Sequence, residues 1–585
     1  MTRRRPRALV LTGALCLALA ACAADVPAEQ ASPAASPSPT PEPGPEQGTV
    51  RTSEAAATVL PTGGLALAAS QTFFDRAPVV VLADDADPAS QLRASSVALA
   101  VGAPVLLDDD GAALATELDR LDAGWVLTVG DATLEARPGD ETTPEATPDA
   151  EDATGDVVVV PAPADDAALA DLLGTTATEP LPAEAGREVA ALAGVERGSF
   201  TPLQAPVAET APSDPATAPA TAAPATEPET QTAELPRLEL PEALPSTLAL
   251  TTGDSTELLA AATARAAGAH LAVVPGGDPR ATSETVAAVS GAGAEHVVGL
   301  GDAFGDAETL GWRAATAATG VELPGGGQLV FPGKRYVALY GSPVTPALGV
   351  LGEQGTPETV ARAAEHAAAY DGLTEDTVVP ALEIIATVAS AGPGTDGNYS
   401  TEWPAEDLRP LVEAAGEAGQ YVVLDLQPGR ASFLEQAQQY ADLLALPHVG
   451  LALDPEWNLG PDEVHMVRIG SVSAAEVNEV VDWLADFTRE RNLPQKLLVL
   501  HQFQVRMIQT VPEVDRSRSE LAVLVHADGQ GGQGAKQSTW RTLHEHAPDI
   551  EWWGWKNFYD EDSPMLTPEQ TMSQVDPVPH FISYQ

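Results

Sequence analysis

The chain has 585 residues and a formal net charge of -54, from 84 acidic and 30 basic residues. A polyanion of this strength is not attracted by charge to an anionic membrane surface or to nucleic acid, so we expect no nucleic-acid partner. The only cysteines are Cys16 and Cys22. Because Cys16 lies in an amino-terminal leader, we expect no disulfide within the mature chain.

The amino-terminal segment has the pattern of an export signal. Four arginines among the first seven residues precede an apolar run from Ala8 to Ala21, shorter than the ~20 residues of a spanning helix. The run ends in Leu-Ala-Ala-Cys22, which resembles the lipobox of bacterial surface lipoproteins. The resemblance implies loss of residues 1–21, a diacylglyceryl group on Cys22 and tethering to the outer face of the cell membrane. The alternative is ordinary signal cleavage with Cys22 unmodified.

Three low-complexity tracts divide the rest of the chain. Residues 22–58 are rich in Pro, Ser and Glu and predict an extended tether. Residues 137–155 form an acidic insertion, and residues 201–234 are mostly Pro, Ala and Thr. The last two tracts lack the aromatic and branched side chains needed to build a core, so we expect disordered linkers there.

Residues 59–200 and 235–330 contain two similar segments. The first reads VVVLADDADPASQLRASSVALAVGAPVLLDDDG and then WVLTVGDATL; the second reads LALTTGDSTELLAAATARAAGAHLAVVPGGD and then HVVGLGDAFG. Each predicts a strand, an acidic turn, an Ala-rich helix, a second strand, another helix and a third strand that ends in Gly-Asp. This alternation predicts a parallel sheet covered by helices, and the similarity indicates an internal duplication.

This layout resembles the cell-wall-binding repeat type 2 of Gram-positive surface proteins. The resemblance implies attachment to cell-wall polymer, although three copies pack together in that family and two are visible here. The alternative is a generic doubly wound α/β domain.

The carboxy-terminal segment, residues 331–585, predicts a (β/α)₈ barrel. Eight apolar runs alternate with helical segments, and we expect residues 307–320 to cover the face left without an eighth helix. The predicted strands are RYVALYG (335–341), VVPALEIIATV (378–388), YVVLDLQ (421–427), VGLALDPEW (449–457), KLLVLHQF (496–503), ELAVLVHAD (520–528), IEWWGWKNF (550–558) and HFISYQ (580–585).

Functional residues of such a barrel lie where strands end and loops begin. Asp454 and Glu456 are two residues apart, so an extended strand points both toward the mouth, where mutual repulsion raises the pKa of one of them. Asp425 is a third catalytic candidate. The candidates for substrate binding at or after other strand ends are Trp457, His501, His526, Asp528, Trp555, Asn557, Tyr559 and Tyr584.

The string GLALDPEW (450–457) resembles the fourth strand of glycoside hydrolase families 18 and 25. The resemblance implies that Glu456 is the proton donor and that Asp454 assists the N-acetyl group or the sugar cation. The longer acidic pattern of family 18 would need acids at Val449 and Ala452, which are apolar here. The alternative is that Asp454 and Glu456 only orient loops by accepting backbone hydrogen bonds.

Other residues keep two interpretations. Alternation on the seventh strand predicts outward packing for Trp552 and a sugar-stacking role for Trp555. Glu383 is either a structural carboxylate paired with Arg335 or Arg430, or a catalytic one. His501, His526 and Asp528 lack a compact metal-ligand spacing, so we expect no metal and no cofactor.

The favoured hypothesis is a membrane-tethered exported lipoprotein whose barrel hydrolyses cell-envelope or environmental glycan, with polysaccharide or peptidoglycan as partner. One alternative is a non-catalytic glycan-binding or cell-wall-binding lipoprotein. Another is a scaffolding lipoprotein that binds an envelope protein through the α/β repeats.

Overall fold

The computed structural model describes residues 45–134, 157–205 and 234–585. The leader, Cys22 and most of the two expected linkers lie outside these ranges. Among the helices of the described ranges, none is long and apolar enough to cross a membrane.

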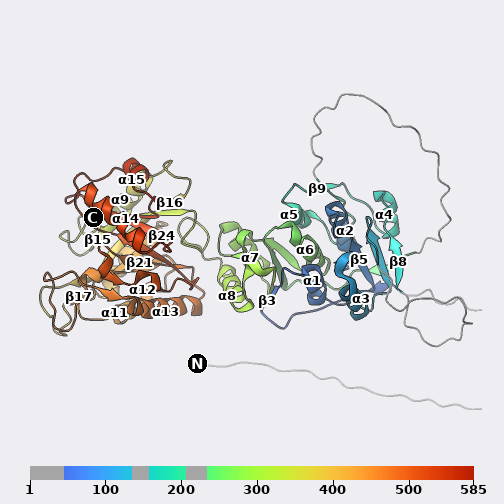
Figure 1. Cartoon of the computed structure of the whole chain (residues 1–585), viewed down its shortest axis with the longest axis horizontal. Helices are drawn as coiled ribbons and strands as arrows, with labels where there is room; N and C mark the ends of the chain where they lie inside the picture. Colours follow the sequence, from blue (N-terminus) through green and yellow to red (C-terminus); the bar gives the residue numbers. More distant parts are fainter. Residues whose placement is uncertain (1–44, 135–156, 206–233) are drawn as a thin grey trace, which may run out of the picture. The chain divides into compact units, whose positions relative to one another are not determined.

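The first α/β unit is a four-stranded parallel sheet in the order β6-β5-β7-β8. Figure 1 labels β5 and β8 of this sheet. Its strands are continuous apolar runs, as expected where helices cover both faces of a parallel sheet. The Asp87 side chain accepts hydrogen bonds from the backbone of Ala89 and Ser90 and begins the first covering helix. The elements are β5 (Val79–Ala83), α2 (Pro88–Val101), β6 (Val105–Leu107), α3 (Gly111–Arg120), β7 (Trp125–Val129), β8 (Val158–Pro161) and α4 (Asp166–Leu172).

The second unit repeats this topology, as the duplication predicted. Its order is β13-β12-β14-β3, so the first strand is again central, with the second and third strands on either side. The elements are β12 (Thr247–Thr251), α6 (Leu258–Ala266), β13 (His270–Val273), α7 (Ser283–Ala292), β14 (His296–Leu300) and α8 (Ala307–Ala318).

The fourth strand of the second sheet comes from the start of the described chain. Strand β3 (Ala57–Leu60) pairs in parallel with β14, and residues 45–58, expected in the tether, contain two short strands and the start of β3. The expected first unit of residues 59–200 therefore does not keep all its strands in one sheet. The short strands pair as β1 (Glu46–Gln47) with β11 (Leu238–Glu239), β2 (Thr49–Val50) with β4 (Phe74–Arg76), and β9 (Leu181–Pro182) with β10 (Leu203–Gln204).

One hydrophobic core serves both α/β units. It joins α1 (Leu65–Phe73), α2 and α6, whose many alanines allow close helix packing, and it also includes α5 (Glu188–Ala191). The two units are thus halves of one packed body. Helix α8, expected to cover the barrel, packs instead on β3, β14 and α7, because its apolar face is used within the second sheet.

The carboxy-terminal segment is a closed barrel of eight parallel strands, which confirms the predicted fold class. All eight predicted strands are present. They are β15 (Lys334–Gly341), β16 (Thr377–Ala389), β18 (Tyr421–Leu426), β19 (Val449–Leu453), β21 (Lys496–His501), β23 (Leu521–Ala527), β24 (Trp552–Asn557) and β25 (Phe581–Tyr584).

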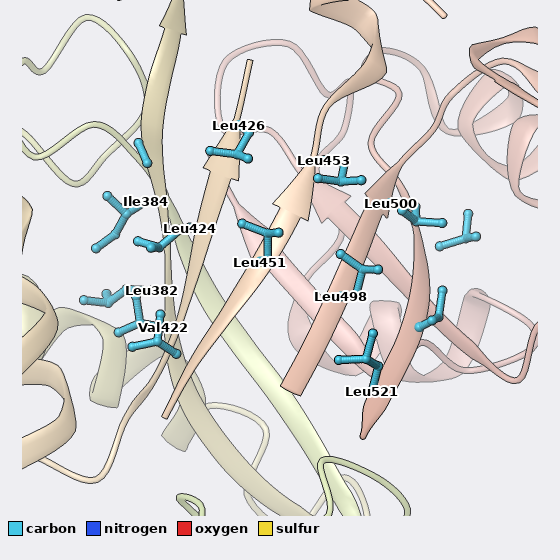
Figure 2. Close-up of a cluster of buried hydrophobic side chains, with 14 of the residues drawn as sticks. Leu382, Ile384, Val422, Leu424, Leu426, Leu451, Leu453, Leu498, Leu500 and Leu521 are labelled. Atoms are coloured by element: carbon cyan, nitrogen blue, oxygen red, sulfur yellow. The ribbon is translucent and has the colours of Figure 1, made fainter. Parts of the chain in front are cut away.

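Helices pack against the outside of the barrel. Outward-facing leucine, isoleucine and valine side chains of the strands form a hydrophobic cluster, part of which is shown in Figure 2. The helices bury their apolar faces against this cluster. The helices are α9 (Thr356–Ala368), α10 (Ala405–Glu417), α11 (Phe433–Gln439), α12 (Ala441–Leu444), α13 (Ala474–Glu490), α14 (Gln533–His546) and α15 (Pro568–Gln574); the short strands are β17 (Ser400–Glu402), β20 (Val472–Ser473) and β22 (Ile508–Gln509).

The lower interior of the barrel, at the amino ends of its strands, is apolar and filled. Tyr336, Tyr421 and Phe581 point inward there, together with Leu323 and Val330 from the segment before β15. Phe331 of the same segment stacks on Trp552 at 4.7 Å between ring centres. Residues 321–333 therefore act as a plug for this end of the barrel.

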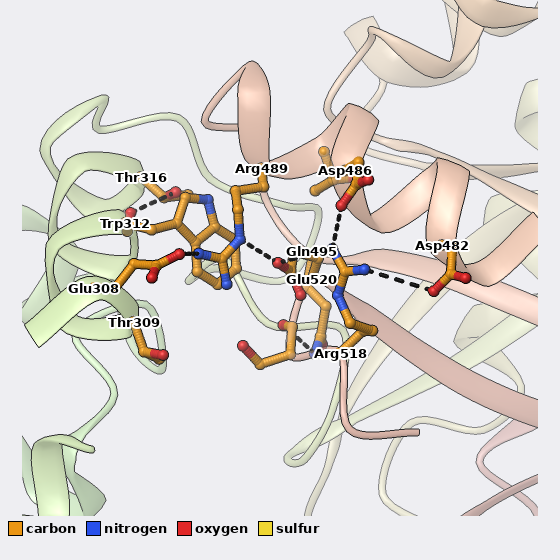
Figure 3. A network of polar contacts seen from close by, with 12 residues as sticks. Glu308, Thr309, Trp312, Thr316, Asp482, Asp486, Arg489, Gln495, Arg518 and Glu520 are labelled. Carbon is orange, nitrogen blue, oxygen red and sulfur yellow. Dashed lines mark hydrogen bonds and ion pairs between the residues drawn. The ribbon is translucent and has the colours of Figure 1, made fainter. Parts of the chain in front are cut away.

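A polar network surrounds Trp312 of α8 (Figure 3). The Arg489 guanidinium lies 4.8 Å from the Trp312 ring centre and pairs with Glu520 at 2.5 Å and Glu308 at 3.5 Å. Arg518 pairs with Asp486 at 2.6 Å and also approaches Glu520. The buried Glu520 carboxylate is therefore matched by two guanidinium groups, as a buried charge requires.

Candidate functional site

The upper interior of the barrel, at the carboxyl ends of its strands, is a layer of polar side chains. Side chains from strands that are not neighbours in the barrel meet there, which shows that they point inward. Tyr340 of β15 donates to Asp425 of β18 at 2.8 Å, and His526 of β23 lies 3.2 Å from Ser583 of β25. The layer consists of Tyr340, Glu383, Asp425, Asp454, His501, His526, Asp528, Lys556 and Ser583, all buried or nearly so.

His501 is the centre of this layer. Its Nδ1 lies 3.0 Å from Asp528 Oδ2, and its Nε2 lies 2.7 Å from Glu383 Oε1 and 3.8 Å from Asp425 Oδ1. Burial disfavours the imidazolium, but Glu383, Asp528 and Asp425 outweigh it and raise the pKa of His501 well above its usual range. His501 is thus a cation that donates from both ring nitrogens.

The other titratable groups respond to burial and to His501. Burial raises the pKa of Asp425 to about 6 despite His501, and burial together with Asp425 raises the pKa of Asp454 well above its usual range. The hydrogen bond from His501 overcomes burial and lowers the pKa of Asp528. Burial and the His501 charge lower the pKa of His526 well below its usual range. At neutral pH, Asp528 is therefore ionised and His526 is neutral, whereas burial and Asp425 disfavour the charged form of Asp454.

Glu456 lies beside this layer in the turn that follows β19. The backbone N–H of Glu456 donates to Asp454 Oδ1 at 3.2 Å, so Asp454 caps the turn that carries Glu456. The Glu456 side chain is partly exposed, and burial followed by the Asp528 charge raises its pKa to about 7, against Lys556 and His501. Trp457, the next residue, is also partly exposed and meets His465 edge to face at 5.4 Å.

Six of the predicted site residues are brought together in or beside the layer: Asp425, Asp454, Glu456, His501, His526 and Asp528. Glu383 joins them and does not pair with either expected arginine. Arg335 pairs with Asp376 at 2.7 Å, and Arg430 donates to the Glu463 carbonyl at 2.7 Å.

Four predicted substrate-binding residues lie on the outside of the barrel instead. Trp555 is buried against Trp540 of α14 and donates to Asn557 Oδ1 at 3.0 Å. Tyr584 shares a hydrogen bond of 2.6 Å with Tyr370, and it lines an outer cavity of about 530 Å³ together with Tyr559. The expected orientation of β24 was wrong. Trp552, expected to face outward, points into the barrel, whereas Trp553 and Trp555 point outward to the helices.

Lys556 is the main residue that sequence reasoning missed. Its Nζ lies 3.3 Å from the centre of the Tyr340 ring, a cation–π contact, and it is 4% exposed. Alternation along the strand could have identified it. Trp552, Gly554 and Lys556 share one face of β24, so Lys556 points inward when Trp552 does.

Comparisons with known proteins give weak likenesses only. No protein-family model matches the chain, and no curated protein matches it. A solved xylanase-A-amylase inhibitor protein is 12% identical with a TM-score of 0.28, over 43% of this chain and 92% of that one. Cwp6 from Clostridium difficile is 11% identical with a TM-score of 0.30, over 68% of this chain, which spans 62% of Cwp6. The 7,8-dihydropteroate synthase from Vibrio fischeri ES114 is 12% identical with a TM-score of 0.21, over 43% and 87%. Likenesses with such low identities and TM-scores support no conclusion about function, which therefore rests on the residues of this chain.

Proposed function

We propose that the barrel hydrolyses glycan that contains N-acetylhexosamine, with Glu456 as the general acid. The observation that carries the proposal is the Glu456 carboxyl itself, which is partly exposed beside a buried charged layer and has a pKa of about 7. A general acid works best when its pKa lies near the working pH. Glu456 is the group at this site that combines such a pKa with access from solvent.

The neighbouring side chains divide the remaining work. Asp454 accepts a hydrogen bond from the Glu456 backbone and caps the turn, so it is a positioning residue for the general acid. Asp528 is ionised, is 9% exposed and is the charge with the largest effect on Glu456. We infer that Asp528 contributes the negative charge that stabilises a cationic sugar. Trp457 offers an apolar ring face for a sugar beside the acid.

A second function, glycan binding without catalysis, is favoured by one observation. Glu383, Asp425 and His501 are buried and engaged with one another, whereas Glu456 and Trp457, at the rim of the barrel mouth, are partly exposed. A filled interior suits a binding rim as well as a catalytic one.

We propose further that the chain is exported, tethered through a lipid on Cys22, and acts on cell-envelope polysaccharide or peptidoglycan. The leader pattern and the lipobox-like Leu-Ala-Ala-Cys22 support the tether. Stable anchoring needs two acyl chains, which a diacylglyceryl group supplies. Cys22→Ser should release the mature chain into the medium; retention of that variant in the membrane fraction would contradict the tether.

The decisive experiment compares the parent with Glu456→Gln on chitin oligosaccharides and peptidoglycan. The variant keeps shape and hydrogen bonding but loses the transferable proton, so hydrolysis should fall by ~10² to 10⁴ while binding persists. Glu545→Gln, an exposed change on α14, is the matched control. Equal hydrolysis by the parent and Glu456→Gln would dismiss the acid. Sugar binding by a parent that hydrolyses none of these substrates would favour the binding function.

A further inference from the structure

The upper layer of the barrel contains buried oxygen and nitrogen atoms that have no role in the proposed hydrolysis. Glu383 Oε2, Asp425 Oδ1 and His526 Nδ1 are buried and have no hydrogen-bond partner within the described residues. Buried polar atoms of folded proteins are nearly always paired, so unpaired atoms grouped in one place call for an explanation. Hydrogen bonding among the side chains of the layer leaves these three atoms unexplained.

Possible metal-ligand atoms of the same residues, together with His501, lie close to one another. One donor atom each from Glu383, His501 and His526 lies within 4.8 Å of the others. His501 Nε2 is 2.7 Å and His526 Nδ1 is 4.0 Å from Glu383 Oε1, and Asp425 Oδ1 is 3.8 Å from His501 Nε2. Donor atoms around a tetrahedral zinc ion, each about 2.0–2.1 Å from the metal, lie roughly 3.3 Å apart. The observed separations bracket that value.

The far sides of both imidazoles are held as metal-binding histidines usually are. His501 Nδ1 lies 3.0 Å from Asp528 Oδ2, and His526 Nε2 lies 3.2 Å from Ser583 Oγ. Such outer partners fix the ring orientation and leave the opposite nitrogen for the metal. The four donors stand on separate barrel strands, β16, β18, β21 and β23, which provide a rigid frame.

We propose that Glu383, Asp425, His501 and His526 form a binding site for a divalent transition-metal ion, with Zn²⁺ the best match to two imidazole and two carboxylate donors. Binding displaces the proton shared between His501 Nε2 and Glu383 and releases it to solvent, so no electron is transferred. Once that proton has left, the four carboxyls of the layer face the Lys556 ammonium alone, so the charge balance favours an added cation. This site goes beyond the proposed hydrolysis and does not depend on Glu456.

The test uses the full chain, stripped with a chelator and then titrated with Zn²⁺. We expect one tightly bound Zn²⁺ per chain by calorimetry and elemental analysis, with a rise in Tm. We also expect the visible absorption of Co²⁺ in a low-coordination imidazole site when Co²⁺ replaces Zn²⁺. The absence of any binding to the parent would overturn the proposal.

Three variants distinguish this site from metal binding elsewhere on the chain. Glu383→Gln, which keeps side-chain size, and His526→Asn, which replaces the imidazole with a smaller polar group, should weaken Zn²⁺ binding by roughly 100-fold or more, since even outer partners contribute 10- to 100-fold. Asp108→Asn alters a surface cluster of Asp84, Asp85 and Asp108 and should leave Zn²⁺ binding unchanged. Binding lost in Asp108→Asn but kept in Glu383→Gln and His526→Asn would also overturn the proposal. Glu456→Gln should keep Zn²⁺ binding, so failure of the hydrolysis proposal leaves this test intact.

Discussion

The two ends of the barrel interior are built by the same strands and have opposite chemistry. At the lower end, aromatic and branched side chains from the strands and the plug fill the interior. At the upper end, every strand contributes a polar or charged side chain. Alternation along each strand brings both sets inward, so the difference lies only in which residue occupies each level.

The comparison shows how one fold separates stability from chemistry. The lower level stabilises the barrel through apolar burial, which needs no partner geometry. The upper level lowers the stability of the barrel unless each buried charge has a counter-charge or a hydrogen bond. His501 meets that need for Glu383, Asp425 and Asp528 together, and the pairs it forms set the proton affinities of the site.

Removing the plug, residues 321–333, should have the largest effect on the stability of the barrel. A chain of residues 334–585 lacks Leu323, Val330 and Phe331 and exposes the lower interior, whereas residues 321–585 keep it filled. Loss of a core Phe side chain alone costs ~3–5 kcal/mol, against total stabilities of about 5–15 kcal/mol. We expect cooperative thermal unfolding for residues 321–585 and aggregation or loss of the transition for residues 334–585. Equal Tm values for the two chains would contradict the plug.

Substitution of Trp555 should lower stability, whereas substitution of Trp457 should weaken glycan binding. Trp555→Ala removes a ring buried between β24 and α14 and should lower the free energy of unfolding by ~3–5 kcal/mol, with glycan binding unchanged in the folded fraction. Trp457→Ala should cost far less stability and weaken glycan binding by roughly tenfold, or about 1.4 kcal/mol. Denaturant titration and binding isotherms measure both, and a binding loss in Trp555→Ala alone would reverse the assignment.

The smallest expected effect is the shift that Lys556 causes in the pH dependence of hydrolysis. Glu456 acts while protonated, and its pKa is about 7 beside Asp528, Lys556 and His501. The rate constant kcat/KM should therefore be level below pH 7 and fall about tenfold per pH unit above it. Lys556→Met removes a positive charge that lowers the Glu456 pKa, so the fall should begin at higher pH. A profile that rises through pH 7 would show that Glu456 acts as a base.

The sequence by itself determined the alternation of elements and the topology that this alternation requires. Apolar runs separated by amphipathic segments located all eight barrel strands and the duplicated α/β units, because parallel strands need crossover connections. Strand ends also located Asp425, Asp454, His501, His526 and Asp528, because the carboxyl ends of parallel strands gather at one end of a barrel.

Only the tertiary structure decided which face of each strand is inside and which distant groups meet. Alternation makes Trp552 and Trp555 equally good inward residues, and closure of the barrel placed Trp552 and Lys556 inside. His501 meets Glu383 across 118 residues of sequence, and β3 joins β14 rather than its own neighbours. No local pattern records such pairings, because they depend on the register and closure of the whole sheet.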